Sequence, residues 1–100
     1  MIRSPGSGKT GAIDVPELSR FFGIVIGMYY QEHKPPHFHA KYSDQTGVFS
    51  LPDLRLIEGQ LPPRVIGLVL EWAFEHRDEL LADWDLAQAR KPLRDISPLV

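Results

Sequence analysis

Three of the four histidines of this 100-residue chain fall within seven positions, at His33, His37 and His39. Two lysines, Lys34 and Lys41, lie in the same segment. Histidine is the side chain whose unperturbed pKa falls between pH 5 and 8, and it is also the commonest metal ligand. This short segment therefore concentrates the groups best suited to acid–base or metal chemistry near neutral pH.

The residues around these histidines alternate in polarity with a period of two, which predicts a β-strand over residues 38–43. Side chains at alternate positions of a strand point to opposite faces of the sheet. The apolar set, expected against the core, is Phe38, Ala40 and Tyr42. The polar set, expected together on the opposite face, is His37, His39 and Lys41.

A metal site is one interpretation of this polar face. His37 and His39 would lie about 7 Å apart by strand rise, which lets both rings reach one ion. His33 could approach from the preceding turn, and Glu32 or His76 could supply a fourth ligand. Three histidine ligands with one open position are the arrangement by which a divalent metal such as zinc activates a water molecule.

Metal-independent cleavage of an RNA phosphodiester is a second interpretation. The reaction needs a base for the 2′-hydroxyl, an acid for the leaving oxygen and a cation for the developing charge. His37 and His39 would supply the acid and the base, and Lys41 the charge. Candidates to hold phosphates or to stack on a base are Arg20, Tyr29, Lys34 and Tyr42. The net charge of −2 argues against strong binding of nucleic acid.

A structural role is the third interpretation. His33 and His37 would brace the turn at Pro35 and Pro36 by bonding backbone groups that the prolines leave unpaired. His39 would then be an ordinary half-buried strand residue, and the exposed sheet face would serve a partner protein. All three interpretations fit the residue types.

The remainder of the chain predicts one small α+β domain over residues 16–100, because strand patterns come first and helical patterns follow. We expect an antiparallel sheet of three to four strands packed against one long or two consecutive C-terminal helices. The expected strands are residues 23–30, 38–43, 48–51 and, as a short fourth strand, 54–58. The helical segment should run from Pro63 to Arg90, with a break near Arg77 if there are two helices.

Composition excludes several classes of protein. The chain has no cysteine, so disulfides, thiolate metal sites and a cysteine nucleophile are excluded. The longest apolar run, residues 23–30, is far shorter than the roughly 20 residues of a membrane-spanning helix. Residues 1–15 are rich in Gly and Ser and lack the apolar centre of a secretory signal. We therefore expect a cytoplasmic protein whose first 15 residues are a disordered or non-native extension. A domain this small has a thin stability margin, which favours a homodimer or a partner.

Several segments resemble a bacterial family of short uncharacterised proteins, the domain of unknown function 4160. They are residues 19–26 and 28–30, the stretch Pro35-Pro36-His37-Phe38-His39-Ala40, and residues 61–62, 69–72 and 79–81. The resemblance implies a protein that works with a small partner protein encoded nearby, as in a toxin–antitoxin module, and it marks His33, His37 and His39 as the family motif. It implies no activity and no cofactor.

Our leading expectation is therefore an interaction component of such a module, with no cofactor. A histidine-dependent ribonuclease is the alternative, and a three-histidine site for a divalent metal such as zinc is the third hypothesis.

Overall fold

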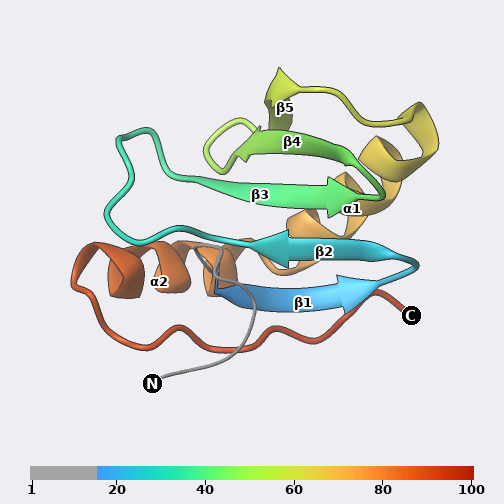
Figure 1. The fold of residues 1–100 in the computed structure, drawn as a ribbon. Coiled ribbons are helices and arrows are strands. Elements are labelled where there is room, and N and C mark those ends of the chain that lie inside the picture. The colour runs from blue at the N-terminus through green and yellow to red at the C-terminus, as the bar shows by residue number, and fades with distance from the viewer. Residues whose placement is uncertain (1–15) are drawn as a thin grey trace, which may run out of the picture.

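Five strands are followed by two helices in the computed structural model, which describes residues 16–100 (Figure 1). The strands are β1 (Glu17–Phe21), β2 (Ile24–Gly27), β3 (His37–Tyr42), β4 (Gln45–Ser50) and β5 (Arg55–Gly59). The helices are α1 (Pro63–Glu75) and α2 (Arg77–Gln88). The predicted α+β class is confirmed. The predicted extension over residues 1–15 lies outside the described residues.

The sheet has five strands, and the prediction of three to four missed β1. Its sequence is short and half polar, and a register shift between Glu17 and Ser19 breaks the alternation that would reveal a strand. The predicted first strand, residues 23–30, is too long at both ends, because β2 ends at Gly27 and Gly23 forms a turn with Phe22, with φ angles of 79° and 51°. That turn joins β1 to β2.

Each strand pairs antiparallel with the next, so the sheet is a meander in the order β1-β2-β3-β4-β5. In the central strand, His39 lies opposite Gly27 of β2 and Val48 of β4. Lys41 lies opposite Val25 of β2 and Thr46 of β4. Residues that face each other across an antiparallel pair share one side of the sheet. Gly27, Val25, Val48 and Thr46 thus lie on the same face of the sheet as His39 and Lys41.

The other face of β3 packs on α1, which crosses behind the sheet in Figure 1. Phe38 and Ala40 are fully buried there, as the alternation predicted. Phe38 stacks on Phe49 of β4 with ring centroids 5.3 Å apart, and it lies 6.1 Å from the ring of Trp72 in α1. These large buried rings are the centre of the core.

The predicted break in the helical segment is confirmed, and it falls at His76, where φ is −115° and ψ is 25°. Beyond α2 the chain runs back beside β1 (Figure 1). There Ile96 donates its backbone N–H to Leu18 at 2.8 Å, and the Trp72 indole donates to the Ser97 carbonyl at 2.8 Å. Neither helix of the described chain is long and apolar enough to cross a membrane.

Candidate functional site

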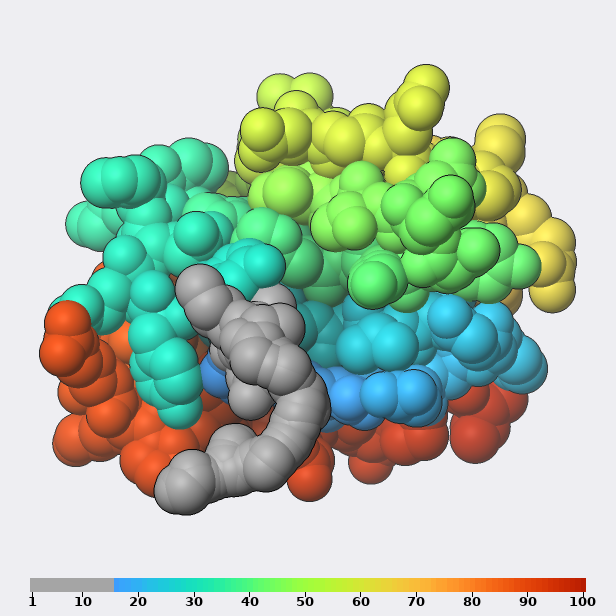
Figure 2. Space-filling view, in the orientation of Figure 1, coloured from blue at the N-terminus to red at the C-terminus, as the bar shows by residue number. Residues whose placement is uncertain are grey.

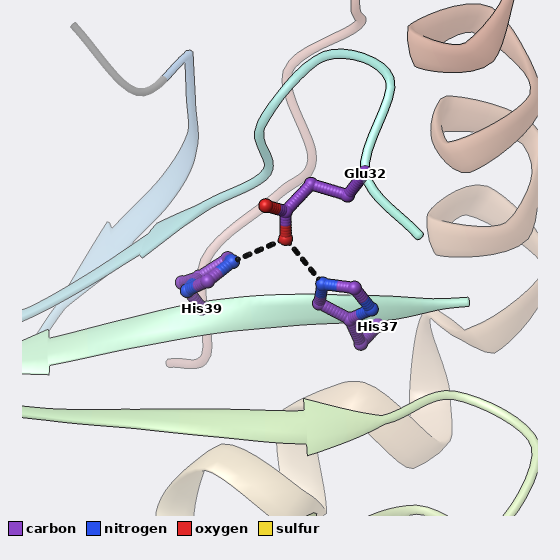
Figure 3. Close-up of side chains that lie close together, drawn as sticks. All are labelled: Glu32, His37 and His39. Atoms are coloured by element: carbon purple, nitrogen blue, oxygen red, sulfur yellow. Dashed lines mark hydrogen bonds and ion pairs between the residues drawn. The ribbon is translucent and has the colours of Figure 1, made fainter. Parts of the chain in front are cut away.

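A single carboxylate, that of Glu32, meets both histidines of β3 (Figure 3). Its Oε1 atom contacts Nε2 of His37 and lies 3.2 Å from Nε2 of His39. All three side chains are half-buried, and their potential ligand atoms lie within 4.8 Å of one another. We call these three residues the Glu–His–His cluster. It lies on the face of β3 that points away from α1.

The loop between β2 and β3 folds back over the sheet, and this places Glu32 beside His37 and His39. Gln31, with a positive φ of 54°, turns the chain just before it. The end of α2 holds this loop, because Gln88 donates its side-chain amide to the Glu32 carbonyl at 3.1 Å and Arg90 donates to the Gln31 side chain. Figure 2 shows the loop, in teal, lying against α2, in orange. The position of Glu32 thus depends on residues more than fifty positions later.

His37 has both ring nitrogens engaged within the protein. Its Nδ1 lies 2.7 Å from the Pro35 carbonyl, which can only accept, so Nδ1 carries a proton. Its Nε2 faces Glu32, and its ring packs on Trp84 of α2 with centroids 5.2 Å apart. Metal-ligating histidines commonly donate their second ring nitrogen to a backbone carbonyl in this way. Because Nδ1 carries a proton, Nε2 can contact the Glu32 carboxylate in two ways. Either Nε2 is also protonated and donates a hydrogen bond, or a cation lies between Nε2 and the carboxylate.

His39 connects the cluster to a pocket of about 300 Å³ on the same face. Its ring meets the Tyr29 ring edge to face, with centroids 4.6 Å apart. The pocket is lined by Val25, Gly27, Tyr29, His39, Lys41 and Thr46. Because Gly27 lies opposite His39 in the register, no side chain of β2 fills the space there.

The charge of Glu32 is set by two opposing effects. Partial burial raises its pKa, but hydrogen bonds with His37 and His39 outweigh burial and hold the pKa below its ordinary value. Glu32 is therefore ionised at neutral pH. An ionised carboxylate beside two imidazoles is a strong partner for a proton or a metal ion.

His33 does not join the cluster. It is exposed on the loop, while its neighbour Glu32 is turned inward. Of the predicted ligand set His33, His37 and His39, the structure brings together only His37 and His39, and the residue beside them is Glu32, which the sequence suggested as a fourth ligand. The other expected fourth ligand, His76, pairs instead with Glu79 at 2.5 Å.

The remaining predicted residues divide between the pocket and other places. Tyr29 and Lys41 line the pocket, whereas Lys34 is exposed on the loop. Arg20 forms an ion pair with Glu17 at 2.8 Å, which holds the pKa of that carboxyl below its ordinary value. Tyr42 packs against the core.

This arrangement suits a metal better than a pair of catalytic histidines. An acid–base pair must present one free ring nitrogen from each histidine to the substrate. His37 would have to give up either its Pro35 or its Glu32 contact to do so. Its geometry is that of a residue held in place to direct Nε2 toward Glu32.

The fold and the cluster define a small α+β domain that carries one carboxylate and two imidazoles on the face of its sheet that points away from α1. The family described as Domain of unknown function (DUF4160) matches residues 23–85, which include the whole Glu–His–His cluster. The chain belongs to this family, and the predicted resemblance is confirmed. No curated protein and no solved structure matches the chain.

Proposed function

We propose that the protein binds a divalent transition metal ion, with zinc as the expected ion, through Glu32, His37 and His39. One observation carries this proposal: a carboxylate oxygen and two imidazole nitrogens converge within 4.8 Å. Two histidines and a glutamate with an open fourth position are the ligand set of several hydrolytic zinc enzymes.

The spacing of the ligand atoms supports the proposal. Glu32 Oε1 and His39 Nε2 lie 3.2 Å apart. Two ligand atoms of a tetrahedral zinc ion, each about 2.0 Å from the metal, would lie about 3.3 Å apart. The bond from His37 Nδ1 to the Pro35 carbonyl fixes the ring with Nε2 directed at the same point. His37 Nε2 contacts Glu32 Oε1 more closely than this spacing, so the carboxylate and the His37 ring would have to move apart to admit an ion.

Zinc in such a site would supply a Lewis acid and a water molecule with a pKa near 7. The chain's own contribution is to hold the ligands and to place a pocket beside them. Lys41 and Tyr29, which line that pocket, would then bind the group on which the metal acts.

The test is a zinc titration of protein made without a histidine tag. Wild type should bind one ion per chain, and His39→Ala should weaken binding by more than about 100-fold, because it removes a ligand rather than a residue that supports one. His33→Ala is the matched control, since His33 lies in the same loop but outside the cluster. It should bind zinc like wild type.

Two results would overturn the proposal. If wild type binds no zinc, the cluster is an ion pair that holds the loop against β3. Equal losses in His33→Ala and His39→Ala would restore the three-histidine ligand set predicted from the sequence.

We also propose that the protein works in the cytoplasm with a small partner protein, as in a toxin–antitoxin pair. The support for a partner is the large apolar side chain of Phe74, which is 73% exposed on α1 and could pack into a pocket of a second protein. The product of an adjacent gene should copurify with wild type and not with Phe74→Glu. Copurification that survives Phe74→Glu, or growth arrest on induction that His39→Ala relieves, would contradict a passive partner role.

A further inference from the structure

We infer that the pocket beside His39 is a binding site for a phosphate ester, with Lys41 as its cationic contact. The inference rests on the proposed metal centre for the second contact of the phosphate.

The register of the sheet assembles this pocket from three strands. Lys41 of β3 has Val25 on one side and Thr46 on the other, and Tyr29 follows β2. The floor beside His39 is Gly27, whose lack of a side chain leaves the hollow. A site built on paired strands holds its groups more precisely than one built on loops.

The polar groups of the pocket are matched to an anion. Lys41 brings a full positive charge, and the hydroxyls of Tyr29 and Thr46 can each donate a hydrogen bond. Within the described residues 16–100, no carboxylate lines the pocket, and Lys41 forms no ion pair. The ammonium is therefore available to an incoming negative group. Charged hydrogen bonds of this kind are the usual means of binding phosphate oxygens.

The shape points to an ester rather than to free phosphate. The volume of about 300 Å³ is at the lower end of pockets that hold small organic ligands. One wall is apolar, formed by Val25 and the ring of Tyr29. His39 belongs to both the pocket and the Glu–His–His cluster, so a phosphate held by Lys41 would lie beside the proposed metal.

The test measures binding of inorganic phosphate and of phenyl phosphate by calorimetry, with zinc-loaded and with metal-free protein. Phenyl phosphate should bind zinc-loaded wild type more tightly than inorganic phosphate does. Lys41→Met should weaken its binding by about tenfold or more, because a charged hydrogen bond is lost. Lys34→Met is the matched control, because Lys34 is an exposed lysine outside the pocket, and it should change nothing.

The failures of the two proposals are distinguishable. Lys41→Met should keep the zinc affinity of wild type, since Lys41 is not a ligand, so a loss of zinc would contradict the separation of pocket and metal. If wild type binds no zinc, the metal proposal fails, and the metal-free titration decides whether the pocket still binds phosphate through Lys41. Equal affinity of wild type and Lys41→Met for phenyl phosphate would overturn the inference, as would equal affinity of wild type for the two phosphates.

Discussion

Glu32 and Asp83 are both carboxylates withdrawn from solvent, yet the protein surrounds them in opposite ways. The side chain of Glu32 is 32% exposed, and its Oε1 faces two imidazoles, so its pKa lies below its ordinary value. Asp83 in α2 is 1% exposed. Its Oδ1 accepts the Arg94 backbone N–H at 2.9 Å, whereas its Oδ2 has no hydrogen-bond partner in the described structure. Burial raises the pKa of Asp83.

The difference teaches which carboxylate can do chemistry. Glu32 is ionised, and one of its oxygens contacts two imidazoles, a side-chain type that commonly binds metal ions. Asp83 is more deeply buried but holds only a backbone amide of the C-terminal segment. If burial were the only criterion, Asp83 would be the candidate functional carboxylate. The hydrogen-bond partners indicate Glu32 instead. α2 connects the two, because Trp84 follows Asp83 and packs on His37.

Replacing Trp84, which lies next to Asp83 and packs on His37, should have the largest effect on stability. Trp84→Ala should lower the free energy of unfolding by about 3–5 kcal/mol, because the side chain is 4% exposed and its loss leaves a cavity. Chemical denaturation measures the change. Trp84→Phe retains an aromatic ring against His37 and should lose less. A loss below about 1 kcal/mol for Trp84→Ala would show that the His37 side of α2 contributes little packing.

Zinc should stabilise the folded protein through Glu32 and not through Asp83. At a zinc concentration 100 times the dissociation constant, the folded state should gain about 2.7 kcal/mol. Glu32→Ala should show little of this gain, and Asp83→Asn should show all of it. Thermal unfolding with and without zinc is the measurement. An equal gain in Glu32→Ala would place the metal elsewhere.

The stability of Asp83→Asn should depend less on pH than that of wild type, because the substitution removes a buried titratable group and keeps the oxygen that accepts from Arg94. Since the folded pKa of Asp83 is raised, its protonated form stabilises the fold below its ordinary value of 3.8, and this contribution is lost as pH rises through the raised pKa. The stability difference between the variant and wild type should therefore grow across that range. A difference that does not change with pH would contradict the burial effect.

Glu32 should show the reverse pH dependence, and a smaller one. Its lowered pKa means that its ionised form stabilises the metal-free fold above the ordinary value of 4.5, and this contribution is lost as pH falls through the lowered pKa. Because the side chain is one-third exposed, the effect should stay below about 1 kcal/mol. Glu32→Gln should remove it in urea denaturation between pH 7 and pH 3. Identical curves would mean that the histidines do not stabilise the carboxylate.

Local pattern predicted the parts of the site that lie within one strand. The alternation in residues 37–42 placed His37 and His39 on one face and Phe38 on the other, and the structure has them there. Glu32 could not be placed with them, because its inward turn depends on contacts from Gln88 and from the loop backbone. No periodicity in the sequence reports such a contact.

The burial of Asp83 can be predicted from its position in the helical pattern. Leu80, Trp84 and Ala87 are buried, and their spacing marks the core side of α2. Asp83 falls on that side, three residues after Leu80 and four before Ala87. A charged residue on the apolar stripe of a helix predicts a buried partner, here the Arg94 amide.

The hydrogen bond from Gln88 to Glu32, 56 positions apart, has a consequence for synthesis on the ribosome. At about 5–20 residues per second, a nascent chain would carry its complete β3 strand for about 2–9 seconds before Gln88 is made. During that time Trp84 and Gln88 cannot yet hold His37 and the Glu32 loop. The meander can pair its strands in order as they emerge, but the Glu–His–His cluster becomes complete only after α2 has been added. A chain that ends before α2 would therefore contain His37 and His39 but would lack the assembled Glu–His–His cluster.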